Sequence, residues 1–224
     1  EIVFTSKSKK IYAFTYNSLL FEYDAESFLI GTPAIGNIDA DPELEITVGG
    51  FSGSNKKLYV VNHDGTDVSN FPLDIGEKIR AGVALFDFND NGLDDIVFGT
   101  ENDNLYMILD DGSIASGFPF SGNDKFKSAP IVLDNGENPI ILAGNDDGTL
   151  YALNSDGSIR FAYETDYSIT TSPSVYNKDD YPYIVFGNSN GEVHGISING
   201  NPNNTFLVQT GGSISSSVLS ADID

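Results

Sequence analysis

The chain has 224 residues, 40% of them hydrophobic, and its 33 acidic and 11 basic residues give a formal net charge of −22 at pH 7. This hydrophobic content is sufficient for a packed core, whereas the charge disfavours binding to nucleic acid or anionic membranes, because both present phosphates that the chain would repel. Cysteine is absent, which excludes disulfides and thiolate chemistry, and no apolar run approaches the ~20 residues of a membrane span, so we expect no membrane insertion.

A short strand-like segment recurs along the chain and marks an internal repeat. Its copies start at residues 1, 45, 95, 139 and 183: EIVF (Glu1–Phe4), EITV (Glu45–Val48), DIVF (Asp95–Phe98), PIIL (Pro139–Leu142) and YIVF (Tyr183–Phe186). A second segment follows each copy, at Lys10–Phe14, Lys57–Val61, Asn104–Ile108, Thr149–Leu153 and Glu192–Ile196. Four of these are followed by a turn triplet ending in glycine, at His63–Gly65, Asp110–Gly112, Ser155–Gly157 and Ile198–Gly200. Glycine supplies the positive φ that a tight hairpin needs, so we expect a hairpin at each triplet.

Each unit contains four short β-like runs, and four strands in 40–50 residues are typical of a propeller blade. We therefore predict an all-β fold, a β-propeller of about five four-stranded antiparallel blades in a single domain, residues 1–224. A β-sandwich is the alternative, but it would not require a fivefold repeat. The predicted units are residues 1–31 (completed by 216–224), 32–81, 82–128, 129–171 and 172–215.

The C-terminal segment Val218–Asp224 matches the first run of a unit, which the first unit lacks. Two interpretations follow. Either the tail completes the first blade and closes a five-bladed ring, or the chain is a fragment of a longer propeller. An open propeller exposes sheet edges, which favours closure.

Two loops rich in Asp and Asn connect the first run to the second in two units. The first acidic loop, Asn37–Glu45, has oxygen-bearing side chains at its positions 1, 3, 5 and 9: Asn37, Asp39, Asp41 and Glu45. The second acidic loop, Asp87–Asp95, has Asp87, Asn89, Asn91 and Asp95 there, with Gly92 at position 6, where the first loop has Pro42. Calcium prefers six to eight such oxygens, and alternating side chains converge when the backbone curls around an ion. We predict a Ca²⁺ site in each loop, although Asx-rich turns without an ion are the alternative.

These loops, together with DIVFG (Asp95–Gly99) and SAP (Ser128–Pro130), resemble the FG-GAP or VCBS repeats of integrin α-subunit propellers and bacterial surface proteins. The resemblance implies calcium held between two strands of a blade. Carried over by position, it adds the main-chain carbonyls of Leu93 and Glu43 as ligands.

Two other units depart from this pattern. Leu133–Pro139 and Tyr176–Tyr183 lack the ligand series, so plain hairpins are expected there. Asp147–Phe161 is similar to quinoprotein-like repeats instead. In the split unit, Asp222 and Asp224 would stand at positions 1 and 3 and Glu1 at position 9, which leaves a third calcium site open.

Aromatic residues occupy one place in the third run of every unit but the last, where His194 stands: Tyr12, Tyr59, Tyr106 and Tyr151. They form either stacking platforms for a sugar or packing between blades, and packing is favoured because a feature shared by all units usually serves the repeat. Neither His63 nor His194 belongs to a recognisable Ser-His-Asp arrangement.

The sequence thus favours a non-catalytic, calcium-binding propeller that serves as an adhesion-type binding or scaffolding module. Its partner would be a protein or glycan ligand on a loop face. A secreted or cell-surface location is expected, because calcium outside the cytoplasm fills even sites of ~10⁻⁴–10⁻³ M affinity. The alternatives are a lectin-like propeller and, less favoured, a polysaccharide lyase or quinoprotein-type enzyme.

Overall fold

The computed structural model describes residues 1–52, 54–134, 136, 138–178, 181–201 and 207–219, and these form an all-β structure in which every strand pairing is antiparallel. The predicted fold class is confirmed. Blade 1 contains β1 (Ile2–Ser6), β2 (Lys10–Phe14) and β3 (Leu19–Asp24), and blade 2 contains β4 (Ala34–Gly36), β5 (Glu45–Gly49), β6 (Lys57–Val61) and β7 (Leu73–Asp74). Blade 3 contains β8 (Ala84–Phe86), β9 (Asp95–Gly99), β10 (Asn104–Ile108) and β11 (Phe120–Ser121). Blade 4 contains β12 (Ile131–Leu133), β13 (Ile140–Gly144), β14 (Thr149–Leu153) and β15 (Ile159–Glu164), and blade 5 contains β16 (Ser174–Lys178), β17 (Tyr181–Gly187), β18 (Glu192–Ser197) and β19 (Val208–Gln209).

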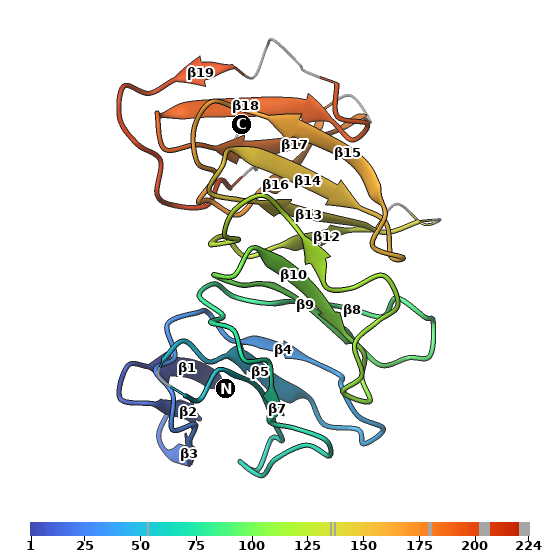
Figure 1. The fold of residues 1–224 in the computed structure, drawn as a ribbon. Coiled ribbons are helices and arrows are strands. Elements are labelled where there is room, and N and C mark those ends of the chain that lie inside the picture. The colour runs from blue at the N-terminus through green and yellow to red at the C-terminus, as the bar shows by residue number, and fades with distance from the viewer. Residues whose placement is uncertain (53, 135, 137, 179–180, 202–206, 220–224) are drawn as a thin grey trace.

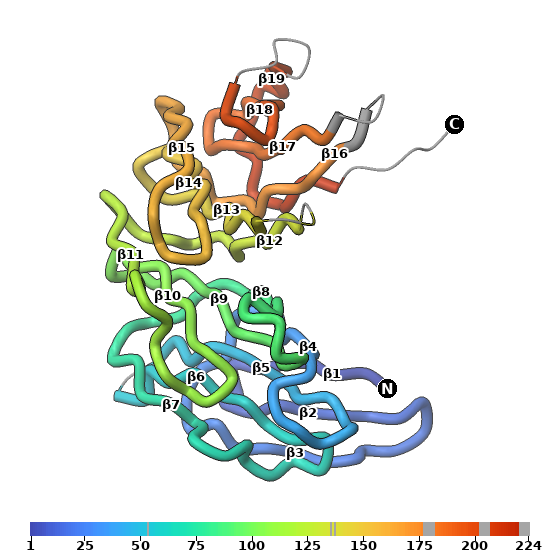
Figure 2. The backbone as a smooth tube through the Cα atoms, turned by 90° about the vertical axis from the view of Figure 1, so that its right-hand side faces the viewer, coloured from blue at the N-terminus to red at the C-terminus, as the bar shows by residue number. Residues whose placement is uncertain are grey.

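The blades follow one another around an arc, with blade 1 at one end and blade 5 at the other (Figures 1 and 2). Strands within a blade are neighbours in chain order. The short first strand β8 contacts the first strands β4 and β12 of the two neighbouring blades. In the described part of the chain blade 1 has three strands, and Ser216–Leu219 form none. The predicted completing strand falls largely on residues 220–224, which lie outside the described residues, as do Asp222 and Asp224.

The core lies between successive blades. Strands β5, β9 and β13 are buried along their whole length, because each is covered by a blade on both faces. Between blades 2 and 3, Leu58, Val60 and Ile79 pack against Ile96, Phe98 and Tyr106. The Val-, Ile- and Phe-rich composition of these strands suits such a two-sided apolar environment.

In blades 2 to 4, an apolar residue that follows the fourth strand packs as a wedge against the last glycine of the second strand. The two residues lie so close that the glycine could not carry a Cβ atom. A Cβ on Gly49 would lie 2.1 Å from Ile79, and one on Gly99 would lie 2.3 Å from Phe126. A Cβ on Gly144 would lie 2.3 Å from Ile169. Close packing therefore requires glycine at this place in blades 2 to 4, whereas blade 1 has Thr5 there.

The pairing of this glycine shows that the predicted alignment of the fourth unit is wrong by one residue. Gly49, Gly99 and Gly144 each pair with the second residue of the third strand, so Ile141 and not Ile140 is equivalent to Ile46. The predicted alignment of the PIIL segment therefore starts one residue too early. The hairpin glycines were predicted correctly, since Gly65, Gly112, Gly157 and Gly200 all have φ between 77° and 87°.

Candidate metal centre

The two acidic loops lie side by side on one face of the arc. The first joins β4 to β5 in blade 2, and the second joins β8 to β9 in blade 3. The blade repeat places equivalent loops at the same strand ends, so these two become neighbours although they are about 50 residues apart in sequence.

In the first acidic loop, three carboxylates converge. Oxygens of Asp39, Asp41 and Glu45 all lie within 4.8 Å of one another. The backbone curls around them, because the amide of Asp41 donates to Asp39 Oδ1 and that of Glu43 donates to Asp41 Oδ1, each at 2.9 Å. Pro42 at position 6 is compatible with this turn. The structure thus brings together three of the side chains that the sequence predicts as ligands.

Glu45 is the buried floor of this group. Its side chain is fully buried, and Oε2 accepts hydrogen bonds from the amides of Ile38 at 2.7 Å and Asp39 at 3.4 Å. Its other oxygen, Oε1, is buried and has no hydrogen-bond partner among the described residues. Burial raises the pKa of Glu45, so a bare carboxylate here is unfavourable. An orphaned buried carboxylate oxygen beside two more carboxylates is the environment that a hard cation satisfies.

The second acidic loop is curled more tightly around its own first residue. Asp87 accepts hydrogen bonds from the amides of Asn91 at 3.1 Å and Gly92 at 2.7 Å. Asp95 is fully buried, and its two oxygens accept from the amides of Phe88 and Asp110. Burial raises the pKa of Asp95 to about 6. Asn89 and Asn91 are exposed and also accept hydrogen bonds from loop amides. The loop therefore has the predicted oxygen-bearing side chains in a compact turn. Main-chain amides donate hydrogen bonds to the same oxygens that would bind an ion.

Some residues of the predicted set have roles that their spacing did not show. The side chain of Asn37 donates to the carbonyl of Gly92 in the second loop at 2.7 Å. Glu43 is exposed and lies with Asp41 within 4.8 Å of the imidazole of His63. Ligation by the carbonyls of Glu43 and Leu93 stays a prediction.

Two residues that the sequence analysis missed join these loops to their surroundings. Asp94 hydrogen-bonds to Asn37 of the neighbouring blade, and Asp110 accepts from the side-chain amide of Asn91. Their partners lie 57 and 19 residues away, respectively, so no spacing within a single loop indicates them.

The aligned tyrosines serve packing and not an open ligand surface. Tyr59, Tyr106 and Tyr151 are 2%, 8% and 5% exposed. Tyr59 donates to the carbonyl of Ala25, and Tyr106 donates to Glu77 at 3.2 Å. The packing interpretation is confirmed for these three.

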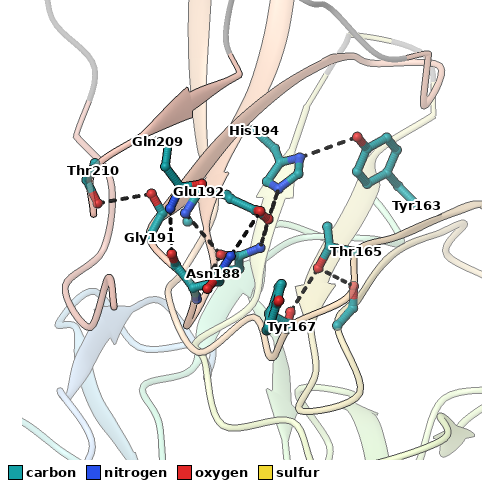
Figure 3. Close-up of polar contacts among 12 residues, drawn as sticks. Tyr163, Thr165, Tyr167, Asn188, Gly191, Glu192, His194, Gln209 and Thr210 are labelled. Carbon is teal, nitrogen blue, oxygen red and sulfur yellow. Dashed lines mark hydrogen bonds and ion pairs between the residues drawn. The ribbon is translucent and has the colours of Figure 1, made fainter. Parts of the chain in front are cut away.

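His194 replaces the tyrosine in blade 5 and is likewise buried. Its ring stacks on Phe186 at 5.3 Å, and Figure 3 shows its contacts with Tyr163, Asn188 and Glu192. Asn188 donates to Glu192 at 2.6 Å, and that hydrogen bond is the main reason why the pKa of Glu192 is lowered. This network closes the junction of blades 4 and 5, so His194 has a structural environment.

Comparison with known proteins supports the fold. Residues 131–213 match the family model described as the lambda-carrageenase beta-propeller domain. No curated protein matches. The chain is a β-propeller. The match covers less than half of the chain, so it is a similarity of this segment and does not assign the chain to that family.

Several solved propellers share the architecture at low sequence identity. BamB from Moraxella catarrhalis is 17% identical with a TM-score of 0.69, covering 96% of this chain and 59% of BamB. BBS1N in complex with ARL6DN is 12% identical with a TM-score of 0.65 (92% and 61% covered), and Sqt1 from Saccharomyces cerevisiae is 12% identical with a TM-score of 0.71 (95% and 59%). The chain thus spans about three fifths of the length of these structures. Among its described residues there is no helix that could span a membrane.

Proposed function

We propose that this protein is a non-catalytic calcium-binding β-propeller of the FG-GAP or VCBS type, acting as a binding or scaffolding module. The observation that carries the proposal is the buried, unpartnered Oε1 of Glu45 beside Asp39 and Asp41. A Ca²⁺ ion would supply the missing partner and neutralise three crowded carboxylates. Asp39, Asp41 and Glu45 would hold it in the first loop, and Asp87, Asn89, Asn91 and Asp95 would hold an ion in the second.

Calcium is favoured over transition metals because the donors are oxygens. The chain has no cysteine, and the donor set of both loops consists of carboxylates, amides and main-chain carbonyls. Such hard ligands suit Ca²⁺ or Mg²⁺, and flexible loops with many oxygens suit the larger ion. The ion would brace the first and second strands of its blade.

The proposed partner is a protein or a glycan that binds a loop face. Support for a protein partner comes from BBS1N, a propeller of similar fold that was crystallised in complex with ARL6DN. The buried state of the aligned tyrosines speaks against a lectin built on those rings. Calcium dependence favours a secreted or cell-surface location, where the ion is abundant.

The second candidate function is a propeller that accompanies polysaccharide degradation. Its support is the match of residues 131–213 to the propeller domain of lambda-carrageenase. A glycan-array screen of the calcium-loaded protein separates this candidate from a protein-binding module, because only the former predicts retention of a polysaccharide.

Thermal unfolding tests the calcium proposal. We expect a clear rise of the midpoint between excess EDTA and millimolar Ca²⁺, since a ligand bound only by the native state at 100 times its Kd stabilises by about 2.7 kcal/mol. Asp39→Ala should remove most of the contribution of the first loop. An identical midpoint in EDTA and Ca²⁺ would contradict the proposal.

A further inference from the structure

The two acidic loops are joined by three hydrogen bonds that cross the boundary between blades 2 and 3. The amide of Asn37 donates to Asp94 Oδ2 at 3.0 Å, and the amide of Asp94 donates back to the Asn37 carbonyl at 2.6 Å. The side-chain amide of Asn37 donates to the Gly92 carbonyl at 2.7 Å. Asn37, the first residue of one loop, is therefore held from both its main chain and its side chain by the other loop.

This junction is packed without spare room. A Cβ at Gly36 would lie 2.4 Å from Asp94 Oδ2 and 2.6 Å from a methyl group of Leu85. Because Gly36 has no Cβ, the carboxylate of Asp94 can approach the backbone of blade 2 closely. The hydrogen bonds of Asp94 are consequently short-range and directional, and they do not arise from a loose surface contact.

The held residue directly precedes the ion site. Ile38 and Asp39, which follow Asn37, direct their amides to Glu45 Oε2, which leaves Oε1 free beside the carboxylates of Asp39 and Asp41. Fixing the main chain of Asn37 fixes the start of this turn. A preorganised turn costs less conformational entropy when an ion binds.

We propose that Asp94 of blade 3 is a positioning residue for the ion site of blade 2, so that calcium binding in the first acidic loop depends on the neighbouring blade. The inference rests on the calcium-binding function proposed above. By linkage, an ion in the first loop also strengthens the contact between blades 2 and 3.

The residue of blade 4 that is equivalent to Asp94 cannot clamp the second acidic loop in the same way. Asp94 immediately precedes β9, and the residue that immediately precedes β13 in blade 4 is Pro139. Proline has neither an amide N–H nor an acceptor side chain, so it cannot make the pair of hydrogen bonds that Asp94 makes. The second loop is instead held by hydrogen bonds within the loop, which the amides of Asn91 and Gly92 donate to Asp87. Loss of Asp94 should therefore weaken the first site selectively.

The test compares three variants by calorimetric Ca²⁺ titration, in the wild-type chain and in an Asp87→Ala background that silences the second loop. Asp94→Ala removes the acceptor for Asn37, and we expect Ca²⁺ affinity at the first loop to fall about 10-fold, as for outer-shell partners of metal ligands. Asp94→Asn keeps an acceptor oxygen and should stay within about threefold of wild type. Asp90→Asn removes the same charge from the same loop, and Asp90 makes none of the contacts to Asn37, so it is the matched control.

Backbone amide hydrogen exchange in EDTA provides a readout that does not need the ion. Asp94→Ala should speed exchange at Asn37, whereas Asp94→Asn and Asp90→Asn should not. If wild type binds Ca²⁺ but Asp94→Ala binds it equally well, the inference fails and the proposed function stands. If Asp94→Asn and Asp90→Asn lose as much Ca²⁺ affinity as Asp94→Ala, the loss comes from the removed negative charge and not from the position of Asn37. That result would also overturn the inference. Absence of Ca²⁺ binding by the wild type would overturn both proposals.

Discussion

Glu45 and Asp95 occupy equivalent places at the starts of β5 and β9, yet their carboxylates are satisfied differently. Both are fully buried. Each oxygen of Asp95 accepts a hydrogen bond from a main-chain amide. In Glu45, by contrast, Oε2 accepts two such hydrogen bonds and Oε1 has no partner among the described residues. Glu45 therefore gains more from a bound cation than Asp95 does, and the first loop is the better candidate site although its position 6 is proline.

Replacement of Glu45 by glutamine should separate the ion from the fold. Glu45→Gln removes the buried charge, so the ion-free protein should be as stable as wild type or slightly more stable, because an uncompensated buried carboxylate is costly. In Ca²⁺ the variant should lose the stabilisation that the first loop provides. Urea unfolding in EDTA and in Ca²⁺ measures both effects. A variant that is equally destabilised in both conditions would show that Glu45 serves the fold alone.

The buried Asp95 should make the ion-free protein sensitive to pH. Burial raises its folded-state pKa to about 6 from an ordinary value of 3.8, so the folded state binds the proton more tightly than the unfolded chain. The associated stability is present below about pH 4 and is lost as pH rises to about 6, by at most about 3 kcal/mol.

Urea unfolding in EDTA between pH 4 and pH 7.5 tests this expectation, with Asp95→Asn as the control for the general charge of the chain. Relative to Asp95→Asn, the wild type should be more stable at pH 4 than at pH 7.5, because protonated Asp95 stabilises the folded state. A pH-independent difference would contradict the raised pKa.

At the scale of the strand, blades 2 to 4 depend on a contact between a wedge residue and a glycine. A Cβ at Gly144 would lie 2.3 Å from Ile169 and so could not be accommodated without a shift of the blade. We expect Gly144→Ala to destabilise the fold by about 1–3 kcal/mol, the range of overpacked cores. Gly212→Ala is the control, since a Cβ there meets nothing within 4 Å. Equal stabilities of the two variants by urea unfolding would refute the wedge.

The residues that blades 2 to 5 bury against a preceding blade are more open in blade 1. Phe98 of blade 3 is fully buried, while Phe4, at the same place in blade 1, is 44% exposed. Phe98→Ala should therefore destabilise by about 3–5 kcal/mol and Phe4→Ala by about 1 kcal/mol, because only the former opens a cavity. Similar losses measured by urea unfolding would mean that the face of blade 1 is covered in solution.

How far the sequence predicts the molecule also differs with scale. The blade, its hairpins and the acidic ligand candidates follow from periodic signals, because each is encoded within one unit of the repeat. The clamp of Asp94 on Asn37 and the approach of His63 to Asp41 were not predictable, since each joins residues that only the folded chain brings together. The need for glycine at position 36 was not predictable for the same reason, because it arises from the close approach of Asp94.

The whole molecule is an arc of blades whose Ca²⁺ candidates lie at one junction, between blades 2 and 3. An ion there would connect the strands of one blade and, through Asn37 and Asp94, stiffen the contact with the next. Bound calcium would give such a module rigidity that disulfides cannot provide, because the chain has no cysteine. Rigid presentation of a loop face is the property that a binding or scaffolding propeller needs.

The most direct test of this account is a crystal structure grown in millimolar CaCl₂ with anomalous data collected to locate calcium. The account predicts an anomalous peak in the first acidic loop, about 2.3–2.6 Å from oxygens of Asp39, Asp41 and Glu45, with Oε1 of Glu45 among them. A well-ordered loop in which Glu45 Oε1 contacts only water, with no anomalous peak, would contradict the central claim that this is a calcium-binding propeller.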